Sequence, residues 1–263
     1  MKMSVGNNLE PEANTEENKS LLAKLKGYFI LLMVTLMGLG NWADSKALII
    51  EGYNGFITHF TNQIEEKKIT ALDIGNYLPY AEKKIGIPQV IKTSSLNTDY
   101  EYRYYKNTKY LLTLINKNTR IVGIAVHSLK YDKAMVPEFT PLIPFNKKML
   151  RVNSLSDVIK SSNEFYFDSH NIKYYMQSKQ LNAQGMFLNL SVGFSNYAPL
   201  LDETQKALFK LDELMLTQDD EKALAKTTEI LANTAATFYA VSELSSEYIS
   251  DSLLTKYEFN AYF

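Results

Sequence analysis

The sequence predicts an α+β protein with an N-terminal transmembrane helix, a helix hairpin packed on an antiparallel β-meander, and C-terminal helices that pack back on the same domain. Three observations support this prediction. An uncharged apolar run lies near the N-terminus, three β-rich runs follow one another from Tyr100, and helical spacing of apolar residues returns from Asp202. The 263 residues, 46% hydrophobic and 22% charged, suffice for a folded core.

Charge, cysteine and glycine content exclude several classes of function. The 28 basic and 29 acidic side chains leave a net charge of -1, so no nucleic-acid partner is expected. The chain has no cysteine, which excludes disulfides, thiol catalysis, cysteine-ligated metals and a lipid-modified cysteine. The eleven glycines are scattered and form no phosphate-binding loop. No cofactor is therefore expected.

An apolar run follows a polar tail. Residues 1–20 have no hydrophobic period and are predicted to be a disordered cytoplasmic tail. Residues 27–40 carry no charge, but as a helix they span roughly 21 Å, less than the roughly 30 Å hydrocarbon core of a bilayer. Extended to 21–43, the helix reaches about 34 Å, which is enough. We therefore expect residues 21–43 to anchor the chain in a lipid bilayer.

Four side chains are expected to hold this anchor in place. Lys24 and Lys26 precede the uncharged run and can extend toward the headgroups. Tyr28 and Trp42 then fall near opposite interfaces, where amphipathic aromatic residues concentrate. Basic residues are concentrated before the span, Lys19 among them, so the N-terminus is expected in the cytoplasm.

Two alternatives to an uncleaved anchor stay open. Ala43, Asp44 and Ser45 could form the cleavage site of a signal peptide, although the acid-rich segment before the apolar run is unusual for one. A buried core helix is the other alternative, and between Phe29 and Met37 it would have only Thr35 for a polar face.

The domain expected over 44–200 begins with a helix hairpin. Apolar residues on one helical face recur at Ile49, Tyr53, Phe56, Phe60 and Ile64. A core-facing helix is predicted there, with a turn at 67–70. The sequence of Thr70–Asp73 has the form of a capping box for a second helix, which Gly86 and Pro88 should end.

An antiparallel meander is predicted next. Tyr100, Tyr102 and Tyr104 alternate with charged residues, so one face of this strand should be a tyrosine row. Tyr110–Ile115 and Ile121–Ser128 are two further β-rich runs, separated by a polar turn.

The remaining segments give weaker signals. Met135–Phe145 holds three prolines and should be extended. Short strand-like runs are Phe165–Phe167, Ile172–Met176 and Met186–Phe194. Residues 201–263 are predicted to form a helical region, in which Asp219 and Asp220 start a helix. Its apolar end should pack back on the domain.

The order of these motifs resembles known families. A helix hairpin closing on "IGIPQ", with Gly86 and Pro88, then the strand of Tyr102, Tyr104 and Tyr105 and the hairpin "INKNTRIVGIAV", resembles the BamE/SmpA and β-lactamase-inhibitor-protein superfamily. The further order of "VGIAVHS", a proline-bearing segment and "NTAATFYAVS" is similar to a poorly characterised family of bacterial single-pass membrane proteins. The resemblance implies a scaffold or binding module in the cell envelope of a bacterium. With the anchor and the cytoplasmic N-terminus expected above, the protein is then expected at the inner membrane with its C-terminal domain in the periplasm.

The candidates for catalysis are few. His59 lies beside an apolar helical stripe with no second ligand one turn away, so no metal site is expected there. His127 could join Asp168 and His170 in a composite site of a hydrolase or metal enzyme. No accompanying motif supports that site, so the chain is expected not to be an enzyme.

The 18 tyrosines are the feature that packing explains least. A tyrosine can fill a core or form an exposed surface that binds a protein partner, and both interpretations stay open. The candidates for partner binding are Tyr100, Tyr102, Tyr104, Tyr105, Tyr110, Tyr174 and Tyr175.

Three functional hypotheses follow. The first is a membrane-anchored, non-enzymatic envelope protein that acts as a protein–protein interaction or scaffold module. The second is a membrane-tethered sensor or regulatory subunit that signals through a helix continuous from Leu21 to about Ile64. The third is the enzyme that uses His127 with Asp168 and His170.

Overall fold

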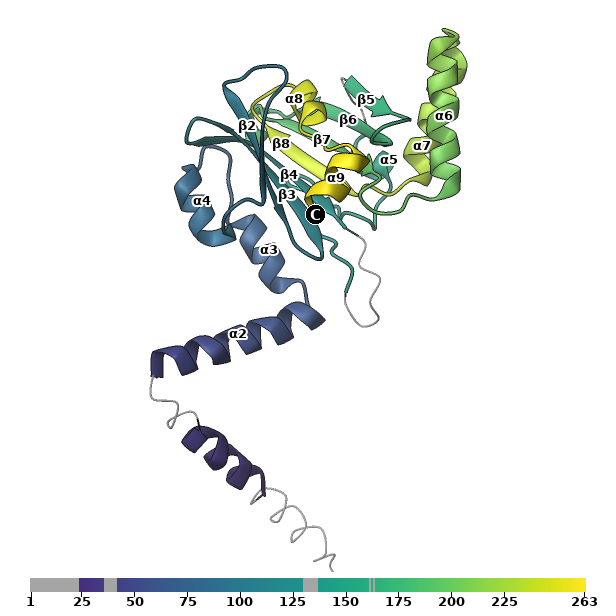
Figure 1. Ribbon diagram of the computed structural model, residues 1–263. Helices are drawn as coiled ribbons and strands as arrows, with labels where there is room; N and C mark the ends of the chain where they lie inside the picture. The colour runs from purple at the N-terminus through teal and green to yellow at the C-terminus, as the bar shows by residue number, and fades with distance from the viewer. Residues whose placement is uncertain (1–23, 36–41, 130–136, 161, 163) are drawn as a thin grey trace, which may run out of the picture. The chain divides into compact units, whose positions relative to one another are not determined.

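The computed structural model describes residues 24–35, 42–129, 137–160, 162 and 164–263, and Figure 1 shows their arrangement. The chain divides into two compact units, Met1–Ile57 and Thr58–Phe263. The sheet, the hydrophobic core and the hollow described below all belong to the second unit.

The first unit contains two helical segments. Residues 24–35 form one helix, and the other is α2 (Trp42–Phe60), whose last three residues belong to the second unit. The predicted tail at 1–20 and parts of the predicted anchor, at 21–23 and 36–41, lie outside the described residues. Among the helices that the structure does describe, none is both long enough and apolar enough to cross a membrane.

The four predicted anchor side chains lie on these two segments. Lys24, Lys26 and Tyr28 belong to the first helix, where all three are exposed, and Trp42 is the first residue of α2. The predicted stripe lies on α2, where Ile49, Tyr53, Phe56 and Phe60 are exposed. That this stripe faces the core stays a prediction.

The helix hairpin is built differently from the prediction. The chain breaks after α2, and α3 (Gln63–Thr70) and α4 (Leu78–Ile85) follow as separate helices. Residues 67–70 are the last turn of α3 rather than a loop, and the Thr70 hydroxyl donates to the carbonyl of Glu66 instead of capping a helix. Gly86 ends α4 as predicted, with a φ of 94° that glycine tolerates.

Eight strands form one sheet, in the order β1-β2-β3-β4-β8-β7-β6-β5, and every neighbouring pair is antiparallel. The strands are β1 (Val90–Thr93), β2 (Tyr100–Lys106), β3 (Tyr110–Lys117), β4 (Arg120–Ser128), β5 (Glu164–Asp168), β6 (Tyr174–Gln180), β7 (Asn189–Ser195) and β8 (Phe238–Ser242). The predicted meander of β2, β3 and β4 is confirmed. Its second turn contains Asn118 at a φ of 54°, a backbone conformation that asparagine adopts more readily than most residues.

The region over 201–263, predicted to be helical, contains one strand besides its helices. β8 lies there, between β4 and β7, and Ala240 pairs with Ala125 of β4. All five residues of β8 are buried, because the strand has neighbours on both sides and covered faces. The alternation of apolar and polar residues that identifies a half-exposed strand is therefore missing.

The remaining helices surround the sheet. They are α5 (Leu155–Val158), η1 (Ala183–Gly185), α6 (Asp202–Leu216), α7 (Asp220–Asn233), α8 (Ser246–Asp251) and α9 (Lys256–Tyr262). Asp219 caps α7 as predicted, accepting a hydrogen bond from the backbone N–H of Lys222. The apolar C-terminal end packs back as predicted, and Leu253 and Leu254 are buried.

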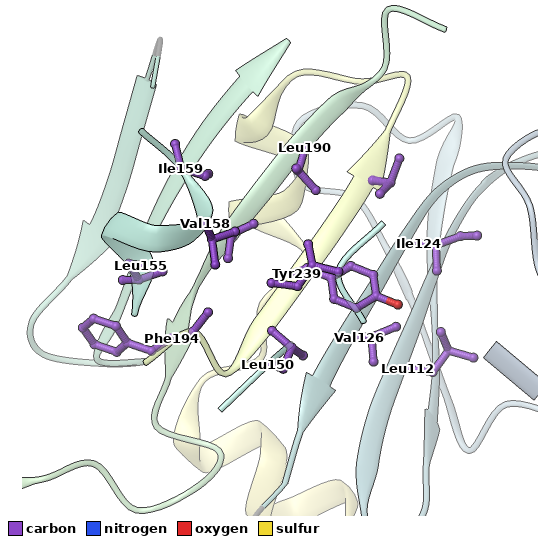
Figure 2. Packing of buried hydrophobic residues seen from close by; sticks show 14 of the residues in the cluster. Leu112, Ile124, Val126, Leu150, Leu155, Val158, Ile159, Leu190, Phe194 and Tyr239 are labelled. Carbon is purple, nitrogen blue, oxygen red and sulfur yellow. The ribbon is translucent and has the colours of Figure 1, made fainter. Parts of the chain in front are cut away.

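The sheet has a different hydrophobic cluster on each face. On one face, residues of α8 and α9 cover the sheet, with Ile249 and Leu254 in the cluster; we call this the closed face. The other cluster combines side chains of α3 to α7 with Ile124, Val126 and Tyr239 of the central strands, and we call its side of the sheet the open face. Figure 2 shows these three strand residues with Leu155 and Val158 of α5.

Candidate functional site

The closed face contains most of the predicted tyrosine row. Tyr102 and Tyr104 of β2 are buried there, as is Tyr174 of β6. Their hydroxyls bind the end of α8: Tyr102 donates to Asp251 (2.6 Å), Tyr104 to the carbonyl of Ser252 (2.8 Å), and Tyr174 pairs with the hydroxyl of Ser250 (2.5 Å). These tyrosines therefore attach the C-terminal helices to the sheet.

Asp251 is the centre of this attachment. Its carboxylate accepts hydrogen bonds from the hydroxyls of Ser94 (2.7 Å) and Ser95, from the backbone N–H of Ser95 (3.0 Å) and from Tyr102. Burial alone would raise the pKa of Asp251, but these donors stabilise the charged form and lower it. The carboxylate is thus a structural ion at neutral pH.

The other candidate tyrosines are also core residues. Tyr105 and Tyr175 are buried on the open face, and Tyr110 packs against Phe139 with ring centroids 5.2 Å apart. Tyr100 is half-buried at the start of β2. Six of the seven candidates are therefore buried in this domain, which places them in the core rather than on an exposed binding face.

His127 is buried on the closed face. Its Nδ1 lies 3.2 Å from the hydroxyl of Ser195, and its ring stacks on Phe238 with centroids 4.6 Å apart. Burial lowers the pKa of His127 to about 3, because the charged imidazolium would lose its hydration. The ring is neutral at physiological pH and acts as part of the core.

Asp168 and His170 belong to a separate turn. The Asp168 carboxylate accepts hydrogen bonds from the backbone N–H groups of His170 (2.7 Å) and Asn171 (3.1 Å), and so holds the turn. The Nδ1 of His170 lies 2.7 Å from the hydroxyl of Ser169, which donates to Asp212 at 2.9 Å.

The contacts of His127 share no residue with those of Asp168 and His170, so the structure does not assemble the composite site that the sequence allowed. No group of three or more potential metal ligands occurs among the described residues. The side chain of His59 lies outside them.

The open face carries an apolar hollow of about 550 Å³, which we call the hollow. Its floor consists of buried side chains, including Ile124 of β4, Tyr239 and Val241 of β8, and Leu188 before β7. Its mouth is exposed: Leu142, Phe145 and Met186 are 63%, 54% and 67% exposed. A smaller cavity of about 270 Å³ adjoins it and shares Ile69, Thr70, Leu142 and Tyr239.

One wall of the hollow is α3 and the turn after it, and a buried ion pair fixes α3 to the sheet. The ammonium group of Lys109, at the start of β3, lies 3.6 Å from the carboxylate of Glu65. It also donates to the carbonyl of Thr61 (2.7 Å) and to the side-chain oxygen of Asn62 (3.0 Å). The carboxylate of Glu65 balances the charge of Lys109, and the two oxygen acceptors satisfy the hydrogen bonds of its ammonium group, which is almost fully buried.

Another part of the wall is the loop after Pro141. The backbone N–H of Ile143 donates to Lys148 (2.8 Å), and that of Leu150 donates to Pro141 (3.0 Å), so the loop closes on itself. Ile143 and Leu150 are buried in the open-face cluster, whereas Leu142 and Phe145 remain exposed beside the hollow. The loop therefore presents apolar side chains that its own packing does not cover.

Tyr239 is the polar group of the floor. Figure 2 shows its ring on the open face, beside Val126 and Ile124. The residue is only 3% exposed, and its hydroxyl makes no hydrogen bond to any residue that the structure describes. Burial raises its pKa, so the phenol is neutral and can both donate and accept a hydrogen bond.

The charges around the two cavities have one sign. Glu66 and Asp73 line the mouths and are acidic, and no basic side chain is among the described residues that line either cavity. The other lining residues are apolar apart from Tyr239 and two threonines, Thr70 and Thr140. The site thus offers a large apolar surface, one neutral phenol and an acidic rim.

Comparisons with known proteins place the chain in no established group. No known protein family's profile matches it, and neither does any curated protein. Among solved structures, it is similar to a cysteine-rich secretory protein from Staphylococcus aureus, with 11% identity and a TM-score of 0.22. That match covers 41% of this chain and 38% of the other, so the chain spans less than half of the protein that it matches.

Proposed function

We propose that the chain is a membrane-tethered, non-enzymatic interaction module, and that a protein partner binds at the mouth of the hollow. The observation that carries this proposal is the group of exposed apolar residues Leu142, Phe145 and Met186 around an apolar depression. Exposed apolar surface of this kind is costly in water and typical of interaction sites. Because the tyrosines of the predicted row are buried, we place the binding surface at this mouth instead.

The tether is residues 21–43. Most of its described part is the helix over 24–35, which exposes a nearly continuous series of large apolar side chains, including Phe29, Ile30, Leu31 and Leu32. A lipid bilayer would cover such a surface. In this proposal the helix lies in the bacterial inner membrane, the N-terminus is cytoplasmic, and the domain is periplasmic.

A binding role is also supported by what the candidate catalytic groups do. His127 is packed in the core, and Asp168 holds a backbone turn. A sensor that signals through one rigid helix has less support, because α2 ends at Phe60 and α3 starts at Gln63.

Photocrosslinking in cells tests the binding surface. A photoreactive phenylalanine analogue replaces Phe145 at the mouth, and the matched control places it at Tyr257 of α9, which is 83% exposed. Position 145 should give one dominant protein adduct that position 257 does not give. Identical adducts at both positions, or none at 145, would refute the mouth as the interaction site.

Fractionation tests the tether. The full chain should sediment with membranes and stay there in high salt, whereas deletion of residues 21–43 should release it. Phosphatase activity of a C-terminal alkaline phosphatase fusion would support the periplasmic orientation, and an inactive fusion of full length would reverse it.

A further inference from the structure

We infer that the floor of the hollow is a binding site for a small uncharged amphiphile, whose polar group hydrogen-bonds to the hydroxyl of Tyr239 while its apolar chain packs on Ile124, Leu188 and Val241. This inference extends the proposed function, since the amphiphile would lie beneath the surface that the protein partner contacts. It does not depend on the identity of that partner.

The size of the hollow fits a small molecule. Its volume of about 550 Å³ is well within the range of roughly 300–1,000 Å³ that is usual for ligand pockets. The floor residues Ile124, Leu188 and Val241 are buried and apolar. The mouth residues Leu142 and Met186 are apolar as well, but exposed. An apolar chain would gain free energy by leaving water for this surface.

The hydroxyl of Tyr239 calls for a polar group on that molecule. Five of the seven buried tyrosines in the described chain have a hydroxyl that hydrogen-bonds to another residue; Tyr110 and Tyr239 do not. Of these two, Tyr239 lines the hollow. The hydroxyl is not among the buried side-chain atoms that lack a partner, so solvent in the hollow can still reach it. A purely apolar ligand would cover it and leave it without a partner, so a ligand that supplies a polar group has an advantage.

Water can reach Tyr239 through the open mouth but gains little there. A well-held water has two to four polar partners, and Tyr239 offers one in a lining that is mostly apolar. Thr70, another polar residue of the lining, already donates its hydroxyl proton to the carbonyl of Glu66. A hydroxyl attached to an apolar chain would satisfy the phenol and fill the space together.

The charge of the rim decides the headgroup. Asp73 at the hollow and Glu66 at the adjoining cavity are acidic, and no lysine or arginine is among the described lining residues. A carboxylate or phosphate in this space would be desolvated beside like charges with no cation to pair with. An alcohol has neither penalty, so the site should select neutral headgroups over anionic ones.

Binding of short-chain probes tests this inference. The full-length chain on lipid nanodiscs is titrated with 1-octanol, octanoate or octane, and probe concentrations are corrected for partitioning into empty nanodiscs. Methyl NMR signals of Ile124 and Met186 report occupancy of the hollow, which both residues line. We expect saturable shifts with octanol at concentrations where octanoate gives at least about tenfold weaker binding.

Three variants locate the bound molecule. Tyr239→Phe should weaken octanol binding about 2- to 10-fold and leave octane binding unchanged, because only the alcohol uses the hydroxyl. Leu142→Asp, at the mouth, should weaken both. Leu224→Asp is the matched control, since Leu224 is exposed on α7 and does not line the hollow, and it should weaken neither.

Each outcome decides the inference. Equal octanol affinity for the parent chain and Tyr239→Phe, or octanoate that binds as well as octanol, would overturn the assigned headgroup. An absence of saturable methyl shifts with octanol would overturn the site itself. The protein adduct expected at position 145 is measured separately, so the interaction module could stand while the amphiphile site fails.

Discussion

The closed and open faces of the sheet use tyrosine in opposite ways. On the closed face, Tyr102, Tyr104 and Tyr174 all pair their hydroxyls with residues at the end of α8, and the face is sealed. On the open face, Tyr239 is equally buried, but its hydroxyl pairs with no described residue and lies in an apolar hollow. Tyrosine thus stabilises the closed face, where helices cover it and pair with its hydroxyl. On the open face, the hydroxyl of Tyr239 stays available to a ligand.

The largest expected effect is on the wall of the open face. Lys109→Met should lower the free energy of unfolding by about 3–5 kcal/mol, because it leaves the carboxylate of Glu65 buried without its cation. Urea denaturation followed by circular dichroism measures this loss. The double variant Lys109→Met with Glu65→Leu should recover much of it, since both charges are then removed. A double variant less stable than Lys109→Met would show that the pair acts through packing instead.

A smaller loss of stability is expected when the hydrogen bonds that hold α8 on the closed face are weakened. Asp251→Asn should cost about 1–3 kcal/mol, because the carboxylate's charge-assisted hydrogen bonds to Ser94, Ser95 and Tyr102 become neutral or are lost. Since folding lowers the pKa of Asp251, the unfolded chain takes up this proton first, and the contribution fades as the pH falls below about 4. Chemical denaturation at pH 7 and at pH 3 should show a smaller difference between parent and variant at pH 3.

The pH dependence of stability should also report on His127. Its pKa of about 3 in the folded protein lies below that of an unfolded chain, so the unfolded state binds the proton first as the pH falls below about 6.5. The parent should lose up to about 2 kcal/mol between pH 7 and pH 5 through this group. His127→Gln should be less stable at pH 7 but should show a flatter pH profile. Parallel profiles would refute the assigned pKa.

The smallest effects compare the two kinds of tyrosine directly. Tyr104→Phe should cost about 1 kcal/mol, because it leaves the buried carbonyl of Ser252 without its donor. Tyr239→Phe should change the stability of the ligand-free chain by less than about 0.5 kcal/mol, because no hydrogen bond is lost. Thermal unfolding of both variants beside the parent measures the difference. A loss at Tyr239 equal to that at Tyr104 would mean that its hydroxyl is already satisfied.

Local sequence predicted the parts of the fold that depend on local signals. The β2–β4 meander was predictable from the alternation in β2, the β-rich runs of β3 and β4 and the polar turn between them, and Gly86 marked the end of α4. β3, β4 and β8 are all buried on both faces, but β8 has only five residues, and a buried apolar run that short cannot be told from a helix segment by its periodicity. The separation of α2 from α3 was missed because the apolar spacing continues across the break.

The site depends still more on long-range arrangement. The floor of the hollow joins Ile124 to Tyr239, residues of strands that are adjacent in space but far apart in the chain. The sequence could mark tyrosines as amphipathic, but not which hydroxyls would find partners. Burial and pairing follow from the sheet order, so Tyr239 could be distinguished from Tyr104 only in the folded structure.

The place of β8 in the sheet has a consequence for how the chain folds. β8 is the last of the eight strands in the sequence, yet it lies between β4 and β7 in the sheet. Until β8 inserts, β4 and β7 each have an unpaired edge. Such edges invite pairing between molecules, and contacts between distant segments form slowly. During synthesis, the strands β1–β4 and the strands β5–β7 would therefore form two separate sheets until β8 joins them. Chaperone capture or intermolecular association should be most frequent in that interval, before Phe238–Ser242 joins the sheet.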